Sequence, residues 1–267
     1  MPHADEEIPI ASQTIGTAQD AGWVWDIALH NRRGVGHVYS SAHSSEDQAA
    51  GALRAYLADS VANPDDISYR KISINPGHRT KFWERNCVAI GLSAGFLEPL
   101  EASALLLIEI AGLMISEQFP ATREAMDVVA KRYNDTFLYR WDRIIDFLKL
   151  HYVLSERTDS EFWIDNRRPE TVPDSLQEMM TLWRYQSPWH DDFDRAVEVF
   201  PAASYQYVLY GMGFRTEASP LGLSEQSRDA ARRLFEQNQQ RAQQAIATMP
   251  GNRELLAKIR QFGLQRV

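Results

Sequence analysis

Two carboxylates, Glu98 and Glu101, stand where an apolar segment rich in small residues runs into a helical pattern. Pro99 between them suits the first helical turn, because proline lacks the amide that would go unpaired there. The start of a helix also offers free amides and a positive dipole end, which favour an anion. The glutamates could simply stabilise or cap their own helix, or one could be a buried catalytic carboxylate beside an anion. The spacing alone leaves both interpretations open.

The segment before the glutamates is rich in residues that allow a close approach of backbone. Gly91, Ala94 and Gly95 would let the chain come near another segment or a flat ligand. The preceding run, residues 87–90, is apolar and predicts a buried strand. Residues 86–104 are therefore expected to form a strand, a small-residue turn and the beginning of a helix.

Other catalytic signatures are missing from the 267 residues. The sequence contains no glycine-rich phosphate loop, no nucleophile elbow, no HExxH zinc motif and no CxxC pair. The seven histidines include no i, i+4 pair, so each is expected to be an ordinary surface or core residue. The single cysteine, Cys87, can form neither an internal disulfide nor a zinc site alone. We expect no metal site.

The overall composition is that of an ordinary globular protein with an acidic balance. There are 28 Lys and Arg against 36 Asp and Glu, a formal charge of −8, which argues against a nucleic-acid surface. The acidic N-terminus lacks the features of a signal peptide. The longest apolar stretch, residues 105–115, is too short to span a bilayer. We expect a cytoplasmic protein with no membrane partner.

The elements that must position the glutamates change character along the chain. Strands are expected at 23–27 and 36–39 as a hairpin, at 67–70, 72–74 and 79–83, with one helix capped by Ser44 and Asp47. The remainder is helical, and the fold class is α+β, mostly helical. Polar loops are expected at 158–172 and 215–223. The predicted helices lie at 99–117, 121–134, 136–154, 173–186, 204–211, 224–248 and 252–262.

Four segments resemble those of the flavin-dependent tryptophan halogenase family, in the family's order. Trp23-Val24-Trp25-Asp26-Ile27-Ala28 resembles the motif WxWxIP, although Ala28 replaces its proline. Residues 86–103 are similar to the family segment NCVAIGLxxGFLEPLExT. Residues 34–41 and 207–214 also fit. The joint occurrence of the four is specific, whereas WxWxI alone would be weak.

The resemblance implies an FAD monooxygenase-like fold and an oxidative activity. Residues 1–98 would be the strand-rich part of the flavin-binding, central-sheet module, and residues 99–267 a helical substrate-binding region. In the family, reduced FAD (supplied by a flavin reductase) and O2 oxidise chloride or bromide. The hypohalous acid then halogenates an aromatic, indole-type substrate.

The resemblance also assigns roles to individual residues. Glu101 falls on the catalytic glutamate, which hydrogen-bonds the hypohalous acid and assists the electrophilic substitution. Ser103 and Ala104 fall on the family's halide-binding Thr-Gly, and the Ala104 methyl group departs from it. The residues implied beside the flavin are Trp23, Trp25, Gly91, Leu92 and Gly95.

Two departures leave alternatives open. The family's N-terminal half, with its dinucleotide fingerprint and catalytic lysine, has no counterpart, and none of the lysines here matches that context. Before Ser204 and Tyr205 there is no carboxylate-plus-aromatic pattern in register, so free tryptophan is not favoured as substrate. The chain would be the C-terminal part of a halogenase, a non-catalytic remnant or binding module, or one half of a split flavin monooxygenase. A missing N-terminal half and a homodimer are the expected protein partners.

Overall fold

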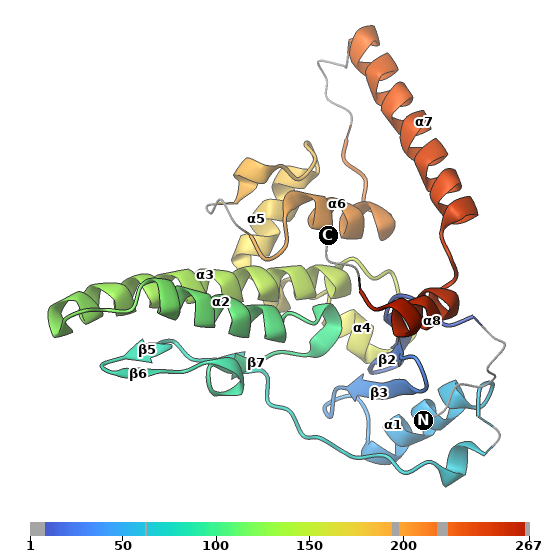
Figure 1. The fold of residues 1–267 in the computed structure, drawn as a ribbon, viewed down its shortest axis with the longest axis horizontal. Helices are drawn as coiled ribbons and strands as arrows, with labels where there is room; N and C mark the ends of the chain where they lie inside the picture. The colour runs from blue at the N-terminus through green and yellow to red at the C-terminus, as the bar shows by residue number, and fades with distance from the viewer. Residues whose placement is uncertain (1–8, 62, 194–197, 218–223, 265–267) are drawn as a thin grey trace. The chain divides into compact units, whose positions relative to one another are not determined.

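The computed structural model describes residues 9–61, 63–193, 198–217 and 224–264. The chain divides into two compact units, residues 1–68 with 218–267, and residues 69–217. Figure 1 shows their elements, and each unit is described by itself. Residues 69–98 thus pack with the helices that follow them. The predicted boundary at residue 98, between a flavin-binding module and a substrate-binding region, refers to a whole enzyme. It stays a prediction.

The first unit is built on an antiparallel sheet of β1 (Ile15–Gln19), β2 (Gly22–Ala28) and β3 (Arg33–Tyr39), with β2 in the centre. The predicted hairpin is confirmed, since Trp23 pairs with Val38 and Trp25 with Gly36. The sequence pattern did not indicate β1. A Cβ at Gly36 would lie 2.3 Å from the Trp25 indole, so only glycine lets that ring lie across β3.

Among its described residues, the first unit also contains the α-helices α1 (Glu46–Leu57), α7 (Glu225–Thr248) and α8 (Asn252–Phe262). The predicted cap of α1 was wrong by one residue. The Ser45 hydroxyl accepts from the Gln48 amide, and the Gln48 side chain accepts from the Ser45 amide. Ser45, with its extended backbone, is therefore the capping residue rather than Ser44. As its polar sequence predicts, α7 buries none of its residues.

The second unit is mostly helical, and the fold class is α+β as predicted. Residues 121–134 and 136–154 were predicted as two helices but form one helix of 31 residues, because no proline or glycine interrupts it. The predicted loop at 158–172 contains a short helix and a 3-10 turn at Pro169–Thr171. The helices are α2 (Ala104–Glu117), α3 (Arg123–Val153), α4 (Glu161–Asp165), α5 (Asp174–Trp183) and α6 (Ala202–Gly211).

The strands predicted between residues 67 and 90 were largely wrong. Within the described ranges, 67–76 forms no strand, and two-residue ladders replace the longer strands. A strand needs a neighbouring strand with which to form hydrogen bonds. The apolar alternation of residues 67–74 does not indicate whether such a neighbour exists. Cys87 is exposed rather than buried. The ladders are β4 (Gly77–His78) with β7 (Gly95–Phe96), and β5 (Trp83–Glu84) with β6 (Cys87–Val88).

Helix α3 organises the core of the second unit, because buried residues along it belong to two apolar clusters. One cluster joins α3 to α2 and the β5–β6 pair, and its largest members are Phe82, Trp83, Leu107, Tyr133, Phe137, Trp141, Ile144 and Leu148. The other joins α3 to α5 and α6, and its largest members are Phe147, Leu150, Leu176, Met179, Trp183, Phe193, Tyr205 and Leu209. The Asn134 side chain binds the Phe82 and Trp83 amides at 2.8 Å, which fixes the strand segment to α3.

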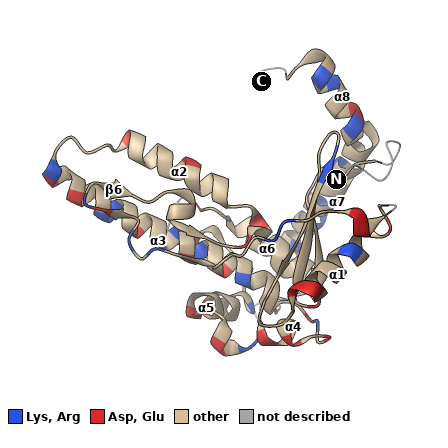
Figure 2. Cartoon of the chain, turned by 90° about the horizontal axis from the view of Figure 1, so that it is seen from below, with Lys and Arg blue, Asp and Glu red and all other residues tan. Residues whose placement is uncertain are grey.

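Helix α2 exposes much apolar surface. Figure 2 shows it as mostly uncharged, and its residues Leu105 and Leu113 are each more than half exposed. Large exposed apolar faces are typical of surfaces that contact another molecule. In the described part of the chain, no helix, α2 included, is long and apolar enough to cross a membrane.

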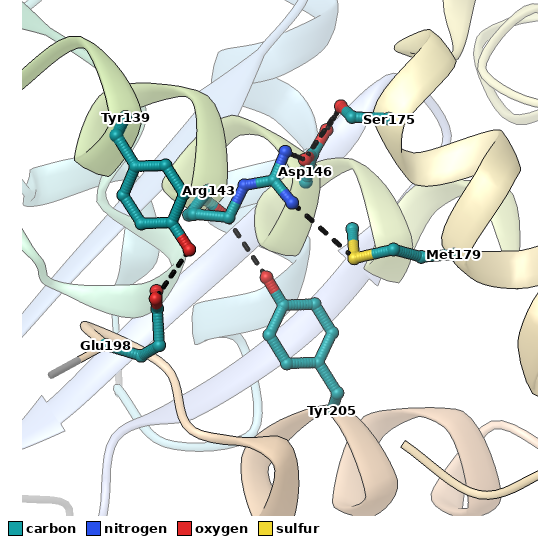
Figure 3. Close-up of polar contacts among 7 residues, drawn as sticks. All are labelled: Tyr139, Arg143, Asp146, Ser175, Met179, Glu198 and Tyr205. Atoms are coloured by element: carbon teal, nitrogen blue, oxygen red, sulfur yellow. Dashed lines mark hydrogen bonds and ion pairs between the residues drawn. The ribbon is translucent and has the colours of Figure 1, made fainter. Parts of the chain in front are cut away.

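A buried polar network ties α3 to α5 and α6 (Figure 3). The Arg143 guanidinium lies 2.7 Å from the Asp146 carboxylate, and Ser175 donates to both carboxylate oxygens at 2.9 Å. The Tyr205 hydroxyl donates to the Arg143 carbonyl at 3.3 Å, and Arg143 also contacts the Met179 sulfur. Burial raises the pKa of Asp146 to about 6, although Arg143 and Ser175 oppose the shift.

The raised pKa of Asp146 predicts a pH-dependent stability. The folded state holds this proton more tightly than the unfolded chain, whose aspartates have a pKa of about 3.9. The free energy of unfolding should therefore fall as pH rises from about 4 to about 6, by up to about 3 kcal/mol from this group. Urea unfolding between these pH values should show the slope in the wild type and lose it in Asp146→Asn. Asp135→Asn, an exposed change on the same helix, should keep the slope. An unchanged slope in Asp146→Asn would contradict the assignment.

Candidate active site

A separate 3-10 turn, Pro99–Glu101, precedes α2; Glu101 is its last residue and Glu98 immediately precedes it. They were predicted in the first turn of a helix at 99–117. The two elements are separate because Ala102 has a left-handed backbone with φ of 47°, which an L-residue adopts at a cost of about 1–2 kcal/mol. This break lets Glu101 and the residues after Ala102 face different surroundings.

An apolar hollow of about 350 Å³ lies on one side of the turn. It is bounded by residues of the 89–111 segment, Glu101 not among them, and by Phe137 and Trp141 of α3. Its only charged lining side chain in the described structure is Glu98. Of the residues implied in flavin and halide binding, five line this hollow: Gly91, Leu92, Gly95, Ser103 and Ala104.

Gly95 supports the hollow through a close backbone contact. A Cβ there would lie 2.6 Å from the Gly77 carbonyl oxygen and 2.7 Å from the His78 Cα. The close approach anticipated at Gly95 is therefore made to another chain segment, strand β4.

Gly95→Ala should separate β4 from β7, because backbone atoms cannot move aside as side chains can. We expect a loss of about 1–3 kcal/mol in the free energy of unfolding, measured in urea. Gly112→Ala is the matched control, since it lies within α2 with open space around it. That change should be neutral or stabilise the helix by up to about 1 kcal/mol. Equal effects of the two changes would contradict the packing described for Gly95.

Glu101 does not line the hollow and instead pairs with His151 in the last turn of α3. The His151 Nε2 and Glu101 Oε1 atoms are 2.9 Å apart, and both side chains are partly exposed. His151 Nδ1 lies 2.8 Å from the Phe147 carbonyl oxygen, one turn earlier on the helix. The carboxylate is thus held by a basic partner, and it is not among the residues that line the hollow.

Glu98 faces a second basic side chain of the same helix end. Burial lowers the pKa of Lys149, and the negative charge of Glu98 opposes that shift. The Lys149 ammonium donates to the Asn166 side chain at 2.9 Å. The turn therefore has a basic partner on α3 for each of its two carboxylates.

Ser103 and Ala104 stand at the start of α2. The Ser103 carbonyl accepts from the Leu107 amide at 3.0 Å, but its hydroxyl makes no capping bond to the helix. The hydroxyl and the first amides of α2 are the polar groups that this end of the hollow offers to an anion. Ala104 adds a methyl group where the family motif has glycine.

Trp23 and Trp25, which the motif comparison implies beside a flavin, belong to the first unit. Trp23 is 5% exposed, and Trp25 lies across Gly34 and Gly36. Their indoles are ordered by packing within the sheet. A role beside the flavin stays a prediction for both.

His151 and Lys149 are the site residues that the sequence did not indicate. The histidines were all expected to be ordinary surface or core residues, and the lysines matched no catalytic context. Glu101 and His151 are 50 positions apart, so no local spacing joins them. The only feature of the sequence that could have indicated His151 is its position as a basic residue in the last turn of a helix. Across the described residues, no His, Cys, Asp and Glu side chains cluster in a way that could hold a metal ion.

Comparison with known proteins identifies the family of this chain. The sequence profile of the family described as Tryptophan halogenase matches residues 1–226. This chain belongs to the tryptophan halogenase family. The tryptophan halogenase of Shewanella frigidimarina is 48% identical and superposes with a TM-score of 0.94, over 100% of this chain and 50% of that one.

This chain also matches only about half the length of each of two characterised halogenases. The 7-chloro-L-tryptophan 6-halogenase KtzR of Kutzneria is 35% identical over 94% of this chain and 48% of its own length. The tryptophan 6-halogenase SttH of Streptomyces toxytricini is 33% identical over 94% of this chain and 47% of its own. The chain therefore spans about half the length of the halogenases it matches. Flavin and halide are the reagents of the family as a whole.

Proposed function

We propose that this chain forms the C-terminal, substitution-site part of a flavin-dependent halogenase acting on an aromatic, indole-type substrate in the cytoplasm. One observation carries the proposal. The left-handed Ala102 separates Glu101, which turns to His151, from Ser103 and Ala104, which line the apolar hollow. This arrangement suits a halide on one side of the turn and an aromatic substrate on the other.

The hollow fits part of FAD rather than all of it. Its apolar lining and its glycines suit the edge of a flat ring. The pyrophosphate does not fit, because Glu98 is the only charged lining residue in the described structure and would repel it. Bound reduced FAD, supplied by a flavin reductase, would contribute the oxidation of chloride or bromide with O2. We propose that the nucleotide part is held by the half that this chain does not cover.

Within this chain, Ser103 would bind the halide and Glu101 would assist the substitution on the aromatic ring. The Ser103 hydroxyl and the amides at the start of α2 would bind the halide ion. Glu101 would hydrogen-bond the hypohalous acid and stabilise the cationic ring formed when the halogen adds to carbon. The O–halogen bond breaks in this step, and its oxygen leaves as hydroxide, which takes a proton from solvent to become water. The same carboxylate can accept the proton that the ring then loses, which restores aromaticity.

The substrate is proposed to be an indole or phenol without a free amino-acid group. The candidate carboxylate before helix α6 is Glu198, and the Tyr139 hydroxyl donates to it at 2.5 Å. A carboxylate already engaged in this way is a poor partner for a substrate ammonium. SttH is named for tryptophan and KtzR for 7-chloro-L-tryptophan, so free tryptophan is the reference compound to test.

The test is a hybrid enzyme, in which this chain replaces the matching half of the S. frigidimarina halogenase. The 48% identity and the TM-score of 0.94 make the exchange conservative. With FAD, a flavin reductase, O2 and halide, the hybrid should halogenate indole-type compounds better than free tryptophan, as read by mass spectrometry. A hybrid that binds FAD and oxidises halide but yields no halogenated product would reject the proposal. That result would favour a non-catalytic binding module.

A further inference from the structure

We infer that His151 is a positioning residue that holds the Glu101 carboxylate in its working orientation. The inference rests on the proposed function, because it concerns the same glutamate. It starts from the 2.9 Å contact between His151 Nε2 and Glu101 Oε1, which joins the end of α3 to the turn before α2.

The His151 ring is fixed by its own helix. A carbonyl oxygen only accepts hydrogen bonds, so the contact with the Phe147 carbonyl at 2.8 Å requires a proton on Nδ1. The Phe147 ring packs against the imidazole edge-on, with centroids 5.1 Å apart and planes at 88°. Phe147 is itself 2% exposed and stacks on Phe200 at 4.0 Å. The imidazole is therefore held by the hydrogen bond at Nδ1 and by the Phe147 ring, and Nε2 is left to meet the carboxylate.

The contact with His151 gives the two carboxylate oxygens of Glu101 different roles. A 2.9 Å separation between Nε2 and Oε1 needs a proton between them, so Oε1 is committed to the histidine. Oε2 remains for the hypohalous acid and for the ring proton. A glutamate without this partner has three rotatable bonds and would sample several orientations. Misplacement of a catalytic group by about 1 Å can cost a hundredfold in rate.

The contact is tested first on the chain alone. The measurement is a ¹H–¹⁵N spectrum of the histidine rings. The signals of His151 are assigned as those that disappear in the His151→Gln variant. Glu101→Gln should then shift the Nε2 signal of His151 and leave the other histidines in place. The matched control is Asp191→Gln, which changes the carboxylate of an exposed pair with His190 at 3.0 Å. It should leave the His151 signals unmoved. An unmoved His151 signal in Glu101→Gln would overturn the inference without touching the proposed function.

The second test uses the hybrid enzyme and two replacements of different chemistry. His151→Phe keeps the ring and removes the donor, whereas His151→Gln can still place an N–H near Oε1. We expect His151→Phe to lower kcat for halogenated product about tenfold to a hundredfold with KM unchanged. His151→Gln should stay within about threefold of the wild type. Release of hypohalous acid, caught with a soluble diketone, should not fall in either variant.

A purely structural role would give different results. Equal losses in His151→Phe and His151→Gln, or equal product in all forms, would overturn the positioning role and leave the proposed function standing. Urea midpoints of the two variants should agree, which separates loss of the donor from loss of folding. A wild-type hybrid that oxidises halide without making product would instead overturn the proposed function and the positioning role with it. His190→Gln, the same change at an exposed histidine, should behave as the wild type.

Discussion

Glu101→Gln in the hybrid enzyme should lower the rate of halogenated product by about a hundredfold to a thousandfold. The amide keeps the size of the side chain but can neither accept the ring proton nor balance the positive charge of the ring intermediate. Flavin reduction and halide oxidation should be unchanged, because Glu101 does not line the hollow. Mass spectrometry of the product and a diketone assay of hypohalous acid measure the two steps separately.

The control for this change is Glu178→Gln, at an exposed position of α5. It should leave product formation at the wild-type rate. Urea unfolding of the chain should show a loss of at most about 1 kcal/mol for Glu101→Gln, as expected for a partly exposed ion pair. Equal product from the wild type and Glu101→Gln would remove Glu101 from the site, and the role carried over from the family motif with it.

The chain purified by itself should carry no FAD. The 267 residues contain no glycine-rich phosphate loop, and the hollow offers the pyrophosphate only the negative charge of Glu98. Absorbance near the flavin band, divided by the protein concentration, should be close to zero for the chain and close to one FAD per chain for the hybrid. A yellow preparation of the chain with stoichiometric flavin would contradict this account of the site.

The sequence predicted helices better than strands, for reasons visible in particular elements. The helix at 252–262 was located correctly, because glycine precedes it and its apolar period is clear. The break predicted near residue 135 was wrong, since nothing there interrupts the backbone hydrogen bonds of α3. Residues 67–74 alternate as a strand would, yet strand formation depends on a partner that local pattern does not specify.

The candidate site could be predicted only where it is contiguous in sequence. Gly91, Gly95 and Ser103 fall within one motif, and the structure places them around one hollow. The walls contributed by Phe137 and Trp141, and the partner of Glu101, come from α3 and depend on tertiary packing. The left-handed Ala102 also escaped prediction, because alanine gives no local signal for a positive φ.

We assign halide binding to the hollow and substitution to Glu101. The most direct test is to measure how much oxidised halogen ends in product and how much is released as hypohalous acid. In the hybrid, halogenated product and released hypohalous acid are measured in the same reaction, and their sum and ratio are compared. Glu101→Gln should keep the sum and shift the ratio almost wholly to released hypohalous acid. Ala104→Leu, which adds bulk to the hollow, should lower the sum and keep the ratio. If Glu101→Gln lowers the sum and leaves the ratio unchanged, the substitution site does not lie at Glu101 and the account is wrong.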